Sequence, residues 1–150
     1  MKVLFVCLGN ICRSPAAEAM LKKKASHAGV EVEVESAGVG DWYEGHLADV
    51  RTRDAAQKRG LVLSGRARLF KLEFMNEFDY ILAVDNHVLN HLKRFQSPKQ
   101  RAKLALITHF SESFKDLEIP DPFYGNDAAF EHVFDILDDS CEGFIKAVVK

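Results

Sequence analysis

This sequence of 150 residues lacks most features that would mark a membrane, secreted or nucleic-acid-binding protein. No apolar run approaches the roughly 18 residues needed to cross a bilayer, so we expect no membrane partner. Its three cysteines are an odd set with no secretory segment ahead of them, which predicts reduced thiols and a cytoplasmic protein. A formal net charge of −2 gives no general basic field, so we expect no nucleic-acid partner.

The sequence also has no internal repeat, low-complexity tract or linker at which it would divide into parts. A domain of this length buries roughly two-thirds of the surface that its unfolded chain exposes, and the chain is too short for two ordinary domains. We therefore predict a single domain over residues 1–150.

What the sequence does contain is an alternation of strand-like and helix-like segments. Apolar runs, most of them β-branched or aromatic, predict strands at 2–6, 30–34, 78–84 and 104–107. Helical spacing of apolar residues predicts helices at 16–28, 47–59, 88–95 and 130–148. This order favours an α/β fold with a parallel sheet covered by helices on both faces, which binds its ligands beyond the carboxyl ends of the strands.

The loop after the first strand, VCLGNICRSP at residues 6–15, falls at that expected binding edge. A sharp turn between Cys7 and the following helix can aim successive N–H groups at one point, and the helix N-terminus favours the same negative charge. Pro15 suits the first helical turn, Ser14 can cap it, and Arg13 adds a planar fork of donors that matches two phosphate oxygens. We therefore predict a phosphate-binding loop with a thiol at its base.

The same positive surroundings favour the thiolate form of Cys7, which is the attacking species. A nucleophile beneath a bound phosphate indicates phosphoryl transfer to sulfur, and the departing oxygen then needs a proton donor from another loop. Asp121 in IPDPFYGND, residues 119–127, is the candidate, because two flanking prolines stiffen its backbone and two aromatic residues follow. An acid beside an aromatic wall suits an aryl phosphate.

Four motifs, in order along the chain, resemble the low-molecular-weight protein tyrosine phosphatases. They are CLGNICRS at the N-terminus, ESAGVGDW at 35–42, FDYILAVD at 78–85 and DPFYGNDAAFE at 121–131. The resemblance implies a three-layer fold with a four-stranded parallel sheet, in which Cys7 is the nucleophile, Arg13 the phosphate clamp and Asp121 the general acid. It implies a phosphocysteine intermediate, with no cofactor and no metal.

The resemblance also implies which residues bind the substrate and who the partners are. Asn10 and Ser14 would brace the loop, with Ser14 donating to the leaving thiolate, while Trp42 and Tyr124 would line the mouth against the substrate ring. The substrate-binding set is Leu8, Gly9, Asn10, Ile11, Cys12, Ser14, Trp42 and Tyr124. The expected partners are phosphotyrosine-containing proteins and inorganic phosphate or another oxyanion, bound by a monomer or weak homo-oligomer.

The sequence departs from the family pattern at two informative positions. Gly65 stands where the family often has a histidine that supports the loop asparagine, so that support is expected to be missing or supplied by water. Relatives that hydrolyse phosphoarginine tend to carry threonine after that asparagine, and Ile11 here points toward phosphotyrosine instead.

Other functions stay open at this point. An arsenate reductase would share the fold and the anion loop, but it needs further cysteines to carry electrons, and none lies between Cys12 and Cys141. A phosphoarginine phosphatase of the same fold and a phosphate-binding module without turnover are the remaining alternatives. A zinc site at Cys7 and Cys12 lacks a second ligand pair.

The second loop cysteine, Cys12, has two interpretations. It fills space beneath the loop, or it captures an oxidised Cys7 as a disulfide, because both thiols lie within one tight turn. The sequence predicts that peroxide inactivates the protein through this reversible disulfide.

Overall fold

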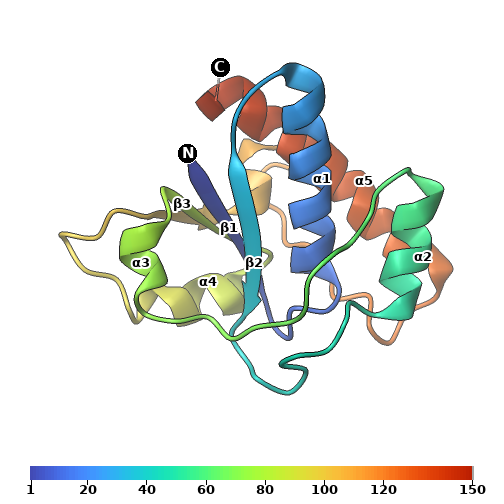
Figure 1. The fold of residues 1–150 in the computed structure, drawn as a ribbon, viewed down its shortest axis with the longest axis horizontal. Coiled ribbons are helices and arrows are strands. Elements are labelled where there is room, and N and C mark those ends of the chain that lie inside the picture. The colour runs from blue at the N-terminus through green and yellow to red at the C-terminus, as the bar shows by residue number, and fades with distance from the viewer. Residues whose placement is uncertain (150) are drawn as a thin grey trace.

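The computed structural model describes residues 1–149, which form a four-stranded parallel sheet between two layers of helices (Figure 1). The strands are β1 (Lys2–Cys7), β2 (Glu33–Gly38), β3 (Tyr80–Ala83) and β4 (Lys103–Leu106), in the spatial order β2-β1-β3-β4. The helices are α1 (Arg13–Ala28), α2 (Val50–Lys58), α3 (Phe74–Glu77), α4 (Asn86–Lys93) and α5 (Asp127–Phe144), with short turns at Ile107–Phe110 and Ile145–Val149. The predicted fold class is confirmed.

Helices cover both faces of the sheet and leave the carboxyl ends of its parallel strands as the edge where a ligand is expected to bind. Helices α1 and α5 pack side by side on one face of the sheet, with α2 against α5, while α3 and α4 lie on the other side (Figure 1). Strand β1 is central and nearly all buried, as its continuous apolar run predicts. Its carboxyl end delivers Cys7 to the edge of the sheet, next to the start of α1.

Strand β2 was predicted at 30–34, and this prediction is wrong in position. The chain is still completing the end of α1 there, because Gly29 adopts a left-handed conformation and the Val30 N–H bonds to the Ala25 carbonyl. Pairing with β1 begins at Glu33 and runs to Gly38, which lies opposite Cys7. The last residues of β2 therefore lie at the binding edge, with Gly38 beside Cys7.

Other boundaries shift for local reasons. Helix α2 begins at Val50 rather than 47, because the Asp49 carboxylate accepts the Arg51 N–H at 2.9 Å and caps the first turn. Helix α5 begins earlier than predicted, capped by Asn126, and its apolar stripe buries Cys141 in the core as expected. The four-residue α3 was not predicted, because one helical turn is too short to display a periodic pattern.

No helix within residues 1–149 is long and apolar enough to cross a membrane.

Candidate active site

The Cys7 thiol lies at the base of the loop that joins β1 to α1. It is 3% exposed, and its sulfur accepts the backbone N–H of Asn10 at 3.2 Å. Asn10 adopts a left-handed backbone conformation with φ of 58°, which turns the loop back over the sulfur. Gly38 on β2 permits this turn, since a Cβ there would stand 3.0 Å from the Leu8 carbonyl oxygen. The sequence thus folds a tight loop around one thiol.

Ser14 acts on this thiol and does not cap α1, contrary to the prediction that it could. The helix begins at Arg13 and its cap position, Cys12, makes no side-chain capping bond. The Ser14 hydroxyl lies inside the first turn, 2.9 Å from the Cys7 sulfur. It therefore contributes a hydrogen bond to the candidate nucleophile.

Asn10 braces the loop through every polar group of its side chain. Its amide nitrogen donates to the hydroxyls of Ser14 at 2.7 Å and Ser36 at 3.0 Å, while its carbonyl oxygen accepts the Arg68 N–H at 2.9 Å. Gly65 contributes no hydrogen bond to this arrangement. Where the family often has a histidine, Asn10 is held by Ser36 and by the backbone N–H of Arg68.

Arg13 is held by groups that lie beyond it in the sequence. Its Nη1 donates to the Asp85 carboxylate and to the Ile119 carbonyl, both at 2.8 Å, and the residue is 3% exposed. Asp85 is fixed in turn because it caps α4 through the Val88 N–H. The guanidinium is thereby oriented with its other edge available to an oxyanion.

The sequence predictions missed Asp85 as a site residue. It lies two residues after the end of β3, at the same edge of the sheet as Cys7, and that position is the signal that could have identified it.

Asp121 faces the same pocket from the loop before α5. One of its carboxylate oxygens is 3.7 Å from Arg13 Nη2, and the other accepts the Phe123 N–H at 3.1 Å. The loop geometry therefore brings Cys7, Arg13 and Asp121 to one pocket, although they come from distant parts of the chain.

The pocket has a volume of about 200 Å³ and an aromatic mouth. It is lined by Cys7, Leu8, Gly9, Ile11, Cys12, Arg13, Trp42, Tyr43, Asp121, Phe123 and Tyr124. Trp42 is 65% exposed and Tyr124 is 96% exposed, as expected for side chains that would meet a substrate. Of the predicted substrate-binding residues, Asn10 and Ser14 lie behind the loop rather than on the pocket wall.

Tyr43 and Phe123 form the inner part of the aromatic wall and were not in the predicted site. Their ring centroids are 6.2 Å apart, and Arg51 donates to the Phe123 carbonyl at 2.8 Å. Tyr43 packs on the loop itself, because a Cβ at Gly9 would stand 2.9 Å from its ring. An aromatic residue next to Trp42 was the available signal, but contact with Gly9 depends on the tertiary fold.

Cys12 is buried and is a weaker acid than an exposed thiol. Burial raises the pKa of Cys12 to about 12, and contact with the Thr52 hydroxyl opposes this only in part. Cys12 is therefore protonated at neutral pH. All three cysteines are free thiols.

Within residues 1–149, no group of three or more histidine, cysteine or acidic side chains is placed to hold a metal ion. The arrangement supplies a thiol, an arginine and a carboxyl group for chemistry on an oxyanion.

The fold and the pocket define an α/β protein whose phosphate-binding loop follows the first strand and holds a thiol at its base. Comparison with known proteins agrees with this class. A sequence model described as low molecular weight phosphotyrosine protein phosphatase matches residues 2–150. The chain therefore belongs to the low molecular weight phosphotyrosine protein phosphatase family, whose members are phosphoric monoester hydrolases.

Similar proteins cover nearly the whole chain. A Synechocystis sp. protein named for the same family is 42% identical in an alignment of 153 positions that covers 100% of this chain and 98% of that protein. The crystal structure of a protein tyrosine phosphatase from Entamoeba histolytica has a TM-score of 0.93 and 39% identity, and covers 97% of this chain and 95% of that one.

Two arginine phosphatases are also similar in structure. A Drosophila arginine phosphatase has a TM-score of 0.90 and 31% identity over 97% of this chain and 96% of its own. The arginine phosphatase YwlE, solved as a C7S mutant with a phosphorylated active-site serine, has a TM-score of 0.86 and 26% identity over 99% of this chain and 97% of its own.

Proposed function

We propose that this phosphatase hydrolyses phosphotyrosine through a phosphocysteine intermediate formed on Cys7. The observation that carries the proposal is the position of the Cys7 sulfur at the base of the pocket, beneath Arg13 and within the same cavity as Asp121. A thiolate there is stabilised by the Asn10 N–H and the Ser14 hydroxyl. The phosphorylated active-site serine in the YwlE C7S mutant supports phosphoryl transfer to an active-site side chain in this fold.

In the first half of the reaction, the Cys7 sulfur attacks the phosphorus atom and the bond from phosphorus to the aryl oxygen breaks. The free edge of the Arg13 guanidinium and the loop N–H groups hold the three phosphoryl oxygens as their charge redistributes. Asp121, in its protonated form, gives its proton to the departing oxygen.

In the second half, Asp121 acts as a base. Its carboxylate takes a proton from water as the water oxygen attacks phosphorus, and the bond between sulfur and phosphorus breaks. The thiolate of Cys7 leaves with the electron pair, where the Ser14 hydroxyl donates to it. Inorganic phosphate is the product, and no metal or cofactor takes part in these steps.

The aromatic mouth supports an aryl substrate. Trp42, Tyr43, Phe123 and Tyr124 offer ring faces and edges around a cavity large enough for a phosphorylated ring. We propose phosphotyrosine-containing proteins as the partners. The reduced, free thiols fit a role in the cytoplasm.

Hydrolysis of para-nitrophenyl phosphate between pH 5 and 7, with a chelator present, tests this function. Turnover under these conditions supports a metal-independent phosphatase, while binding of phosphate without turnover would indicate a binding module.

Phosphoarginine hydrolysis is the second candidate, because two similar structures are of arginine phosphatases. Ile11, which lines the pocket, argues against it, since an apolar side chain offers no hydrogen bond to a guanidinium. The comparison to make is kcat/KM for matched phosphotyrosine and phosphoarginine peptides. Preference for phosphoarginine would overturn our substrate assignment, and Ile11→Thr is the variant that should move the preference toward it.

A further inference from the structure

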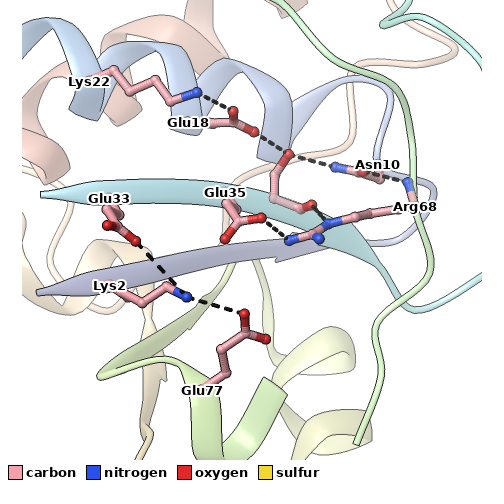
Figure 2. A network of polar contacts seen from close by, with 9 residues as sticks. Lys2, Asn10, Glu18, Lys22, Glu33, Glu35, Arg68 and Glu77 are labelled. Carbon is pink, nitrogen blue, oxygen red and sulfur yellow. Dashed lines mark hydrogen bonds and ion pairs between the residues drawn. The ribbon is translucent and has the colours of Figure 1, made fainter. Parts of the chain in front are cut away.

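A chain of hydrogen bonds runs from Glu18 on α1 to the candidate nucleophile, and Figure 2 shows the part of it from Glu18 to Asn10. Glu18 Oε1 accepts the Ser36 hydroxyl at 2.7 Å, and the oxygen of that hydroxyl accepts the Asn10 amide at 3.0 Å. The same Asn10 nitrogen donates to the Ser14 hydroxyl at 2.7 Å, which is 2.9 Å from the Cys7 sulfur. Four hydrogen bonds therefore separate the Glu18 carboxylate from the sulfur.

The direction of these hydrogen bonds is fixed at the Glu18 end. A carboxylate has no proton to donate, so the Ser36 hydroxyl must direct its hydrogen toward Glu18. Its lone pairs are then left for the Asn10 amide. The orientation of that amide is fixed independently, because the carbonyl oxygen of Asn10 accepts the Arg68 N–H.

The direction is carried onward to the sulfur. Both N–H groups of Asn10 donate, so the Ser14 oxygen accepts one of them and must direct its own hydrogen elsewhere. Its two possible acceptors are the Cys7 sulfur at 2.9 Å and the Ala37 carbonyl at 3.4 Å. The shorter contact favours the sulfur.

Glu18 has no substitute in this arrangement. Among residues 1–149, the Ser36 hydroxyl has no other hydrogen-bond acceptor. The neighbouring Glu35 pairs with the Arg68 guanidinium instead, at 2.8 Å (Figure 2). Glu18 is largely buried, with 17% of its side chain exposed, and its second oxygen pairs with Lys22 at 2.6 Å.

Glu18 also borders a second cavity, behind the phosphate-binding loop. This cavity, of about 210 Å³, is lined by Asn10, Ser36, Gly65 and Arg68 among others. Gly65 has no side chain to reach into it, and a Cβ there would meet nothing within 4 Å. The loop asparagine therefore depends on Ser14 of α1, Ser36 of β2 and the backbone N–H of Arg68.

From these contacts we infer that Glu18 is a positioning residue for Cys7, an inference that rests on the proposed function of that thiol. By accepting the Ser36 hydrogen, Glu18 leaves the Ser36 oxygen free to accept from the Asn10 amide, which holds Asn10 where its other N–H donates to Ser14 and the Ser14 hydroxyl donates to the sulfur. This donation stabilises the thiolate both as it attacks and as it leaves. Glu18 touches no substrate, and its effect is on the rate of the chemical steps rather than on binding.

Glu18→Ala tests the inference. Without an acceptor, the Ser36 hydroxyl rotates freely, so its hold on the Asn10 amide is weakened and the Ser14 hydroxyl is less firmly directed at the sulfur. We expect kcat for para-nitrophenyl phosphate to fall about tenfold with KM nearly unchanged, and alkylation of Cys7 by iodoacetate to slow by a similar factor. Glu18→Gln retains an acceptor oxygen and should recover most of both rates.

The matched control is Glu33→Ala. Glu33 lies on β2 and pairs with Lys2 at 4.0 Å, outside the chain of hydrogen bonds (Figure 2). This variant should leave both rates unchanged. If Glu18 only ties α1 to β2, Glu18→Ala would lower the thermal midpoint while kcat and the alkylation rate stayed at the parent values, and the inference would be wrong.

A double-variant comparison is the decisive test. In a Ser14→Ala background the chain is already broken, so adding Glu18→Ala should slow alkylation by less than about twofold. The same tenfold effect in both backgrounds would show that Glu18 acts by another route and would overturn the inference. Failure of the proposed function is distinguishable, because the parent protein would then show no turnover, whatever the variants did to alkylation.

Discussion

The base of the pocket and its mouth are held in contrasting ways. At the base, Cys7 and Arg13 are each 3% exposed, and their polar atoms are engaged by groups from several parts of the sheet edge. At the mouth, Trp42 and Tyr124 project into solvent at 65% and 96% exposure. Side chains at the base are constrained by hydrogen bonds, whereas at the mouth the Tyr124 ring packs against Phe123, with ring centroids 5.0 Å apart.

This difference separates two tasks. Phosphoryl transfer needs hydrogen-bond donors that are already oriented before the substrate arrives. Donors that had to reorient during the reaction would stabilise the charge of the transition state less well. Recognition of a protein substrate needs exposed apolar surface that can adapt to a ring and its neighbours. Changes at the base should therefore lower kcat, and changes at the mouth should mainly raise KM.

The largest effect is expected from Cys7→Ser. Its hydroxyl is a far weaker nucleophile than a thiolate, so turnover should fall by several orders of magnitude. The loop donors remain, so phosphate should still raise the thermal midpoint of the variant. Steady-state kinetics measure the loss of turnover, and thermal unfolding with added phosphate measures the retained binding. Near-parent turnover would contradict the account.

Asp121→Ala should cost roughly 100- to 10,000-fold on substrates with basic leaving groups. The loss should be much smaller for good leaving groups, which depart without a proton. A series of aryl phosphates of graded acidity measures this. Equal loss across the series would mean that another group supplies the proton.

Arg13→Lys should lower kcat/KM by about 100-fold or more. The guanidinium already uses Nη1 for Asp85 and the Ile119 carbonyl, and its other edge is left for phosphate. A single ammonium group cannot serve all three partners. If the lysine variant retained parent kinetics and phosphate affinity, the proposed clamp would be wrong.

At the mouth, Tyr124→Ala should raise KM for a phosphotyrosine peptide about fivefold with little change in kcat, since one aromatic contact contributes about 1 kcal/mol. Val62→Ala is the control, because Val62 is an exposed apolar residue that does not line the pocket. A fall in kcat that matched the loss in kcat/KM would place Tyr124 with the base of the pocket instead.

The smallest effect on turnover is expected from Cys12→Ala, which should keep parent activity within about twofold and recover poorly after peroxide treatment. Because the pKa of Cys12 is raised to about 12, the fraction of thiolate that can capture oxidised Cys7 is small at neutral pH and grows as pH rises. Recovery with dithiothreitol should therefore improve from pH 6 to pH 9 in the parent protein. Full recovery in the variant would leave Cys12 with a packing role only.

The sequence predicted the residues within one loop from their spacing and the distant Asp121, Trp42 and Tyr124 from their motifs, but it missed partners that only the pairing of strands reveals. Cys7, Arg13 and Ser14 fall within one loop, so their spacing was enough to indicate a phosphate-binding site. Asp85 and Ser36 reach the same place through parallel pairing of separate strands, which spacing along the chain does not reveal.

Local competition explains the errors at element boundaries. The segment at 30–34 has strand-like residues, yet the end of α1 still holds Val30, so β2 begins later. Ser14 has the residue type of a helix cap, but the neighbouring sulfur and the Asn10 amide take its hydrogen bonds. In both cases a neighbouring hydrogen bond outweighed the preference that the residue types suggest.

The most direct test of the central claim is to identify the residue that carries phosphate during turnover. The enzyme would be mixed rapidly with para-nitrophenyl phosphate, quenched, digested and analysed by mass spectrometry under conditions that preserve a thiophosphate bond. We predict a phosphoryl group on the Cys7 sulfur, formed within the first turnover and accumulating further in a variant at Asp121. Phosphate on another residue, or turnover with no phosphorylated Cys7 at any time, would contradict the account.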